Sequence, residues 1–179
     1  AREKNLVDQP NERKLQKQPV PLIGGLCVFF GVIVGTLVAS CFMDCTELVP
    51  ILMAMSMMLF LGSMDDLIGL SPSLRFCFEI FIMVALIYGG GGCIDSLHGL
   101  WGIDAFSWWI AVPLTVFAGV GVINAINMID GVNGLCSGIC ITCCCLFGYA
   151  FFCGHDYPNS MLCFAMAAAL LPFLVHNVV

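Results

Sequence analysis

The sequence predicts an all-α protein, a polytopic transmembrane helical bundle with about six spans in this chain. Hydrophobic residues make up 60% of the 179 residues and charged residues only 10%, whereas soluble domains carry about 25% charged residues. Runs without charge recur along the chain, and a bilayer core about 30 Å thick needs about 20 apolar residues per span. Backbone groups in hydrocarbon must be hydrogen-bonded within their own segment, so these runs are expected to be helices.

Six runs have the composition and length of membrane spans. In chain order they cover residues 21–42, 48–64, 74–93, 106–127, 135–153 and 159–178. Turn-forming residues separate them, as in Ser71-Pro72-Ser73 before the third run and Tyr157-Pro158-Asn159 before the sixth. Residues 1–179 are expected to form a single transmembrane domain. Because the last run ends at Val179 without a polar flank, we expect the chain to be a fragment of a longer multi-pass protein.

The basic residues predict the orientation of the spans. Five of the six Lys and Arg residues precede the first run, and short cytoplasmic loops are enriched in these residues. Residues 1–19 are therefore expected to be a cytoplasmic basic segment. Alternating the spans places the loops at 65–73 and 128–134 on the same side. The sequence gives no support for nucleic-acid binding, because the formal net charge is -6 and the Lys and Arg residues are concentrated near the N-terminal end.

The first candidate site is a pair of adjacent acids, Asp65 and Asp66, which directly follow an apolar run. Charged groups at membrane depth are usually paired or functional, and adjacent carboxylates repel each other unless a cation neutralises them. Mg²⁺ suits one or two acids, because it retains water and substrate phosphates as further ligands. A solvated pair that caps a loop is the alternative, and the pair alone does not decide between them.

The second candidate site is a polar stretch in which Asn124, Asn127, Asp130 and Asn133 recur every third residue. This spacing aligns the first of them on one helix face if the helix persists to Ile129. Two Asx-Gly pairs in the stretch are turn signals, so the polar groups are expected to project from the cytoplasmic end of a span. A capped turn whose amides join two helices is the alternative, although the stretch has more amide and acid groups than a turn requires.

Two further features involve charge. Lys17 lies shortly before the first run, where a basic residue either sets topology and attracts lipid or meets an anionic phosphate. Arg75 and Glu79 are four residues apart in the third run, a spacing at which helical side chains meet. We interpret them as a snorkelling structural pair.

Together these motifs resemble the polyprenyl-phosphate N-acetylhexosamine-1-phosphate transferase family, and the chain looks closest to its WecA-type branch, the undecaprenyl-phosphate GlcNAc-1-phosphate transferases. The resemblance covers nearly the whole chain, and the order and spacing of the motifs make it specific. The matching stretches are DQPNERK (8–14), PLIGG (21–25), LGSMDD (61–66), NAINMIDGVNGL (124–135) and FAMAAALLPF (164–173).

The resemblance implies an enzyme that transfers N-acetylhexosamine-1-phosphate, in this branch GlcNAc-1-phosphate, from a UDP-sugar to undecaprenyl phosphate and releases UMP. Such a reaction starts a lipid-linked cell-surface polysaccharide pathway. The resemblance also implies Mg²⁺ or Mn²⁺ as cofactor, membrane lipid as surroundings, and a bacterial inner membrane location with the active site facing the cytoplasm. A homodimer is one assembly that the protein could form. The implied catalytic residues are Asp65, Asp66 and Asp130, the implied metal ligands Asp65 and Asp66, and the implied substrate-binding residues Lys17, Asn127 and Asn133.

The chain departs from the family pattern at two positions. Asn133 stands where the family usually has a second Asp, which weakens any metal binding there, and Gly69 replaces a third Asp that follows the adjacent pair. A later Gly-Asp-x-Gly-Ser segment and a His-containing loop would lie beyond Val179, so this chain alone is expected to be inactive. A noncatalytic membrane scaffold and a transporter are the alternative functions. A transporter predicts charges near the midplane rather than at a membrane edge.

Overall fold

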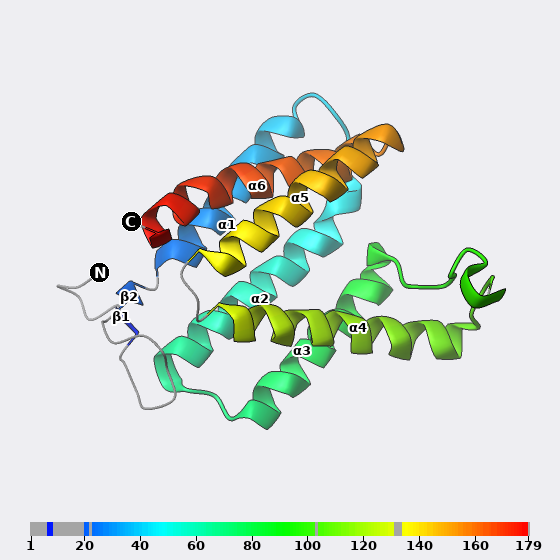
Figure 1. The fold of residues 1–179 in the computed structure, drawn as a ribbon, viewed down its shortest axis with the longest axis horizontal. Coiled ribbons are helices and arrows are strands. Elements are labelled where there is room, and N and C mark those ends of the chain that lie inside the picture. The colour runs from blue at the N-terminus through cyan, green and yellow to red at the C-terminus, as the bar shows by residue number, and fades with distance from the viewer. Residues whose placement is uncertain (1–6, 9–19, 22, 103, 131–133, 179) are drawn as a thin grey trace. The chain divides into compact units, whose positions relative to one another are not determined.

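The structure, a computed structural model, describes residues 7–8, 20–21, 23–102, 104–130 and 134–178. Helices dominate these ranges, which confirms the predicted all-α helical bundle (Figure 1). The long helices are α1 (Ile23–Ala39), α2 (Val49–Ile68), α3 (Pro72–Leu86), α4 (Trp108–Ile129), α5 (Leu135–Cys153) and α6 (Tyr157–Val178). The short elements are η2 (Thr46–Leu48), η3 (Ile87–Gly91), η4 (Leu100–Gly102) and an antiparallel pair of two-residue strands, β1 (Val7–Asp8) and β2 (Val20–Pro21).

Each long helix lies on one of the six predicted runs. Within the described residues, five segments are long and apolar enough to cross a membrane: Thr46–Ile68, Pro72–Gly90, Trp108–Ile129, Leu135–Cys153 and Tyr157–His176. The remaining helix, α1, has 17 residues and is shorter than the usual span of about 20. Within the described residues the first run thus forms a shorter apolar helix, which ends in a turn after Ala39.

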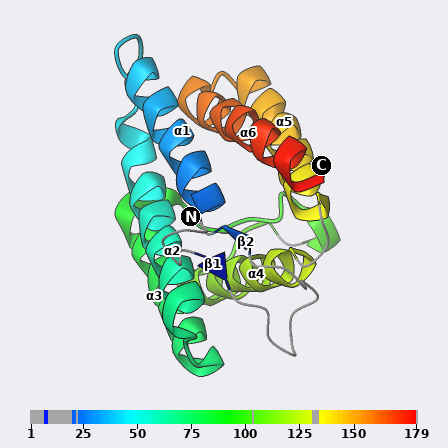
Figure 2. The same ribbon diagram turned by 90° about the vertical axis from the view of Figure 1, so that its left-hand side faces the viewer.

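The chain divides into two compact units, which are described separately. Unit 1 consists of Ala1–Val49 with Ile126–Val179, and unit 2 consists of Pro50–Ala125. In unit 1, α6 packs along both α5 and α1, and Figure 2 shows α5 and α6 side by side. Small residues allow the α1–α6 contact: a Cβ built on Gly31 would lie only 3.2 Å from the Cβ of Ala169. Close approach at small residues is the usual way in which membrane helices associate.

Unit 2 contains α3 and most of α2 and α4. Pro72 begins α3, and the Ser71 hydroxyl caps the helix by accepting a hydrogen bond from the Leu74 N–H at 3.4 Å. The side chain of Met83 on α3 lies against Gly119 on α4, where a larger residue would collide with it. This contact brings α3 and α4 together in the apolar part of the unit.

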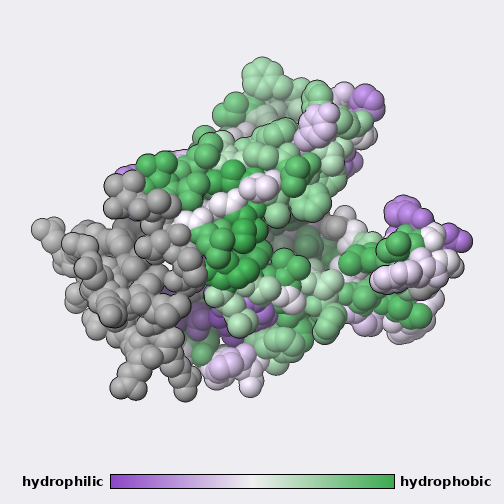
Figure 3. Space-filling view, in the orientation of Figure 1, coloured by the Kyte–Doolittle hydropathy of each residue, from purple (hydrophilic) through white to green (hydrophobic). Residues whose placement is uncertain are grey.

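Large hydrophobic side chains cover much of the outer surface of the helices (Figure 3). Phe60 on α2 is 66% exposed and Phe117 on α4 is 79% exposed. Soluble monomers rarely expose large contiguous apolar patches, so this surface fits contact with lipid rather than with water. Both the composition and the exposed apolar surface indicate a multi-pass membrane protein.

Candidate functional site

The last turn of α2 carries Asp65 and Asp66. The helix continues to Ile68, so both residues belong to the helix and not to the predicted loop at 65–73. Gly69 then ends the helix: its φ of +64° is left-handed, and its N–H donates a hydrogen bond to the Asp65 carbonyl at 2.8 Å. Glycine adopts this conformation without the strain that a Cβ causes. Gly69 thus has a structural role at this helix end.

The position of the two acids in α2 is electrostatically unfavourable. The last turn of a helix has unpaired carbonyl groups and carries the negative end of the helix dipole. No basic residue lies in the last turn of α2. The Asp65 side chain is partly buried and its Oδ1 accepts a hydrogen bond from the Leu70 N–H at 3.0 Å, whereas Asp66 is exposed. The two carboxylates therefore favour a cation supplied from outside α2.

A basic partner comes from α3. Arg75 Nη1 lies 3.4 Å from Asp65 Oδ2, and Arg75 Nε donates a hydrogen bond to Glu79 Oε1 at 2.9 Å. The predicted meeting of Arg75 and Glu79 is confirmed. The interpretation of this pair as snorkelling is wrong for Glu79, because its side chain is only 1% exposed and does not reach toward the surface. Arg75 instead links a buried acid on α3 to the acidic turn of α2.

Asn124 on α4 completes the surroundings of Glu79. Its Nδ2 donates hydrogen bonds to Glu79 Oε2 and to the Val120 carbonyl, the latter at 2.9 Å. A buried carboxylate is costly unless it is paired and hydrogen-bonded, and here both carboxylate oxygens have partners. We call Asp65, Arg75, Glu79 and Asn124 the polar network. It joins α2, α3 and α4, and it brings the first residue of the predicted polar stretch into contact with the surroundings of the acidic pair.

The link between Glu79 and Asn124 is not predicted by the sequence patterns. The available signal was an acid inside an apolar run, since intramembrane acids usually have a partner or a function. Arg75, four residues before Glu79, already provides such a partner, so the sequence gives no reason to look for a second one. The second partner is 45 positions along the chain, and no local pattern identifies it.

The rest of the polar stretch lies in unit 1. The helix α4 reaches Ile129, as the predicted alignment requires, and the Asp130 N–H donates a hydrogen bond to the Ile126 carbonyl at 3.1 Å. The side chains of Asn127 and Asp130 are exposed. Unit 2 thus contains Asp65 and Asp66, and unit 1 contains Asp130. Lys17 and Asn133 lie outside the described residues, so their substrate-binding role stays a prediction.

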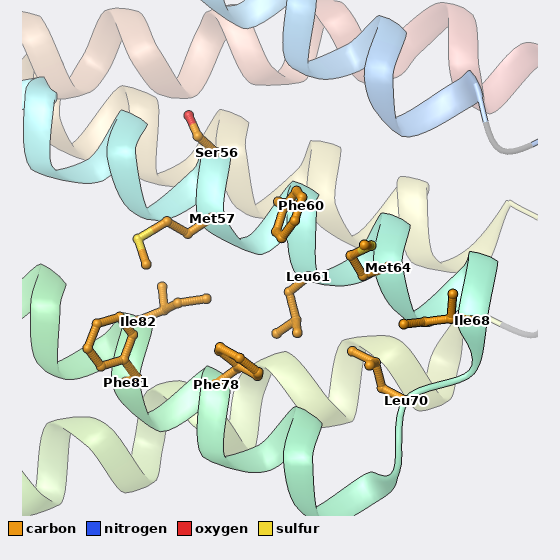
Figure 4. A pocket seen from close by; sticks show the side chains of 10 residues that line it. All are labelled: Ser56, Met57, Phe60, Leu61, Met64, Ile68, Leu70, Phe78, Phe81 and Ile82. Atoms are coloured by element: carbon orange, nitrogen blue, oxygen red, sulfur yellow. The ribbon is translucent and has the colours of Figure 1, made fainter.

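An apolar groove lies between α2 and α3 in unit 2 (Figure 4). Its volume is about 540 Å³, which is within the range of small-molecule sites. Met64 immediately precedes Asp65, and Leu70 donates its N–H to Asp65, so one end of the groove adjoins the polar network. The groove is lined by Ser56, Met57, Phe60, Leu61, Met64, Ile68, Leu70, Phe78, Phe81 and Ile82.

The donor set of the acidic turn fits a hard divalent cation. No three His, Cys, Asp or Glu side chains are grouped to hold a metal in the part of the chain that the structure describes. A cation at Asp65 and Asp66 would therefore need further ligands from water or phosphate. Mg²⁺ is commonly bound in this manner, through one or two carboxylates and substrate phosphates.

Comparison with known proteins gives consistent matches. Residues 48–179 match the family model of glycosyl transferase family 4. A Bacillus subtilis (strain 168) protein named probable undecaprenyl-phosphate N-acetylglucosaminyl 1-phosphate transferase is 31% identical over 172 residues, which cover 96% of this chain and 48% of that protein. The undecaprenyl-phosphate alpha-N-acetylglucosaminyl 1-phosphate transferase of Escherichia coli (strain K12) is 29% identical over 182 residues, which cover 99% of this chain and 48% of that protein.

A Salmonella typhi protein with the same name as the Escherichia coli relative is 31% identical over 183 residues, which cover 96% of this chain and 47% of that protein. The chain spans about half the length of these relatives. No solved structure matches it. The family match covers α2 to α6 and includes both the acidic turn and the polar stretch. The chain belongs to glycosyl transferase family 4.

Proposed function

We propose that the protein transfers GlcNAc-1-phosphate, or another N-acetylhexosamine-1-phosphate, from a UDP-sugar to undecaprenyl phosphate and releases UMP. The family and the names of the relatives support this reaction. The structural observation that carries the proposal is the acidic turn of α2, which adjoins both Arg75 and one end of an apolar groove. Charged groups at the end of an apolar groove suit a reaction between a lipid phosphate and a soluble nucleotide-sugar.

The proposed chemistry is phosphoryl transfer. An oxygen of the lipid phosphate attacks the β-phosphorus of the UDP-sugar, a new P–O bond forms, and the bond from that phosphorus to the oxygen of the leaving UMP breaks. Such reactions depend mainly on positioning and on neutralisation of phosphate charge. A Mg²⁺ or Mn²⁺ ion at Asp65 and Asp66 would supply that neutralisation when bound. Because the lipid phosphate is already largely ionised near neutral pH, the two acids orient groups rather than remove a proton.

We propose the groove between α2 and α3 as the binding site of the polyprenyl chain. Its lining runs along α2 from Ser56 to Ile68, a helical length of about 18 Å. The lining side chains are apolar apart from Ser56. An isoprenoid chain in this groove would have its phosphate at the end beside Asp65 and Arg75. Apolar lining with a few polar groups at one end is the usual arrangement of ligand sites.

The remaining assignments follow from the resemblance. Asn127 and Asp130 are proposed to contact the UDP-sugar, with Lys17 and Asn133 as further substrate-binding residues. The basic segment before α1 supports a cytoplasmic site in a bacterial inner membrane, since basic residues are enriched on that side. A homodimer stays a prediction. The transporter alternative gains no support from Glu79, because this buried acid is held by Arg75 and Asn124.

A donor comparison tests this proposal. The full-length protein, purified in detergent, is supplied with Mg²⁺, undecaprenyl phosphate and one of several UDP-sugars labelled in the sugar. We expect the label of UDP-GlcNAc to enter the lipid fraction as UMP appears in the aqueous phase. Transfer from UDP-GalNAc alone would assign a different hexosamine to the same reaction. No transfer from any UDP-sugar would favour a noncatalytic scaffold.

A further inference from the structure

We propose that Glu79 is a positioning residue of the acidic turn: it competes with Asp65 for Arg75, so that the guanidinium offsets the charge of Asp65 only in part and the turn can bind a divalent cation. Glu79 would not touch the cation or the substrates and would act through Arg75. This inference rests on the proposed function, in which Asp65 and Asp66 hold the cation.

The distances show which acid Arg75 pairs with more closely. Its Nε lies 2.9 Å from Glu79 Oε1, whereas its Nη1 lies 3.4 Å from Asp65 Oδ2. Strong charge-assisted bonds between a guanidinium and a carboxylate have N···O distances of about 2.7–2.9 Å. The contact with Glu79 meets that range and the contact with Asp65 does not. Arg75 therefore forms its tighter ion pair with the buried acid.

Two neighbours hold Glu79 in place for this role. It lies on the same helix as Arg75, at the i,i+4 spacing that favours side-chain pairing. Its other oxygen accepts a hydrogen bond from Asn124, and Asn124 is itself bonded to the Val120 carbonyl on α4. Since the side chain is 1% exposed, water does not compete for either oxygen. The carboxylate that holds Arg75 is thus fixed by contacts from two helices.

The way in which the acids share Arg75 affects how strongly the acidic turn attracts a cation. Arg75 carries one positive charge, which Glu79 and Asp65 share. With a carboxylate at residue 79, the guanidinium offsets only part of the charge of Asp65. Without that carboxylate, Arg75 would pair more fully with Asp65, and the acidic turn would attract a divalent cation less strongly. An opposite charge nearby lowers the attraction of a carboxylate for a second cation.

A simpler role for Glu79 makes a different prediction. If Glu79 only neutralised Arg75 within the membrane, its loss would reduce stability and would not change cation binding. Both roles predict destabilisation on Glu79→Ala, because truncating one partner of a buried pair is costly. The affinity of the acidic turn for a cation, measured without substrates, separates the two roles.

The test measures Mn²⁺ binding by the full-length protein in detergent, from the electron paramagnetic resonance signal of unbound Mn²⁺. Glu79→Gln keeps the size of the side chain and an acceptor for Asn124. We expect its dissociation constant for Mn²⁺ to rise about 5-fold, the effect of a partly exposed ion pair. The double variant Arg75→Gln/Glu79→Gln removes the competing guanidinium and should bind Mn²⁺ within about twofold of the parent. Glu47→Gln, the same change at an exposed residue of η2, is the control and should match the parent.

Three results would overturn the inference. Parental Mn²⁺ affinity in Glu79→Gln would show that Glu79 is only structural. Equally weak binding in the single and double variants would show that the charge of Glu79, and not its hold on Arg75, sets the affinity. Absence of Mn²⁺ binding by the parent would remove the cation site itself. If the parent binds Mn²⁺ but releases no UMP, the proposed function fails, and the affinities of the variants still decide the role of Glu79.

Discussion

Glu79 on α3 accepts a hydrogen bond from the side-chain amide of Asn124 on α4, inside the apolar part of unit 2. The same carboxylate binds Arg75, which reaches Asp65 in the last turn of α2. One buried acid therefore connects the first asparagine of the polar stretch to the acidic pair. This connection gives a physical reason for a charge in the interior of an otherwise apolar segment.

The contribution of Asn124 to stability can be measured directly. Asn124→Ala leaves Glu79 Oε2 without its hydrogen-bond donor, and an unsatisfied buried charged group costs about 1–3 kcal/mol or more. We expect a lower melting temperature in detergent, followed by tryptophan fluorescence. Thr142→Ala removes an exposed hydroxyl that bonds within α5, and it should change stability by no more than about 0.5 kcal/mol. Equal melting temperatures for the two variants would contradict a stabilising Glu79–Asn124 bond.

Gly69 provides a test of the helix end that positions the acids. A Cβ at this residue would meet nothing within 4 Å, so Gly69→Ala adds only the strain of φ +64°. That strain is about 1–2 kcal/mol for an L-residue. We expect reduced stability and reduced UMP release, because the last turn of α2 would shift. Gly62→Ala is the matched control: it also has open space, and in the interior of α2 alanine is favoured over glycine by about 1 kcal/mol. A destabilised Gly62→Ala with an unaffected Gly69→Ala would be the opposite of this expectation.

The groove predicts a dependence on acceptor chain length. Met57 lines the groove eight residues before Asp65, a helical distance of about 12 Å. Met57→Trp should raise the KM for undecaprenyl phosphate with little change in kcat, since it removes binding without touching the reacting groups. A very short acceptor such as dimethylallyl phosphate, whose single isoprene unit ends before Met57, should be affected less. Met53→Trp, on an exposed residue of α2 outside the groove lining, is the control. The same change in KM in both variants would argue against the groove as the binding site of the lipid.

Asp44 predicts a pH dependence outside the proposed site. Hydrogen bonds from the Thr46 hydroxyl and then from the Thr46 N–H lower the pKa of Asp44 below its ordinary value of 3.8. Because the folded pKa is lowered, the bonds stabilise the protein above the unfolded pKa, and this contribution is lost as pH falls through the folded pKa. Asp44→Asn should therefore lower the melting temperature at pH 7, and the difference from the parent should shrink as the pH falls below 3.8. A difference that stays constant as the pH is lowered would contradict this assignment.

Much of the fold was predictable because membrane spans are encoded by composition. Each of the six helices falls on an uncharged or nearly uncharged run, since hydrocarbon requires an apolar segment that pairs its own backbone. The ends were less predictable. Charge predicts that the second run ends before Asp65, but backbone hydrogen bonds continue α2 to Ile68, and the left-handed conformation of Gly69 then ends the helix. Charge marks the limit of an apolar run and not the limit of a helix.

The candidate site was predictable in part for a related reason. Adjacent acids and regularly spaced amides are visible as local patterns, so Asp65, Asp66 and Asp130 could be selected from the sequence. The polar network depends on a contact between two helices. The spacing of Arg75 and Glu79 fits a lipid-facing surface pair and a buried one equally well, and only the packing of α3 against α4 distinguishes them.

The most direct test of the account measures UMP release from UDP-GlcNAc by the full-length protein, in detergent with Mg²⁺, with and without undecaprenyl phosphate. We predict that UMP release requires both the lipid phosphate and the cation. Asp65→Asn, which keeps the size of the side chain and removes its charge, should reduce release by at least about 100-fold, as expected when an electrostatic contribution to phosphoryl transfer is lost. Parental release from Asp65→Asn, or release that does not depend on undecaprenyl phosphate, would contradict it.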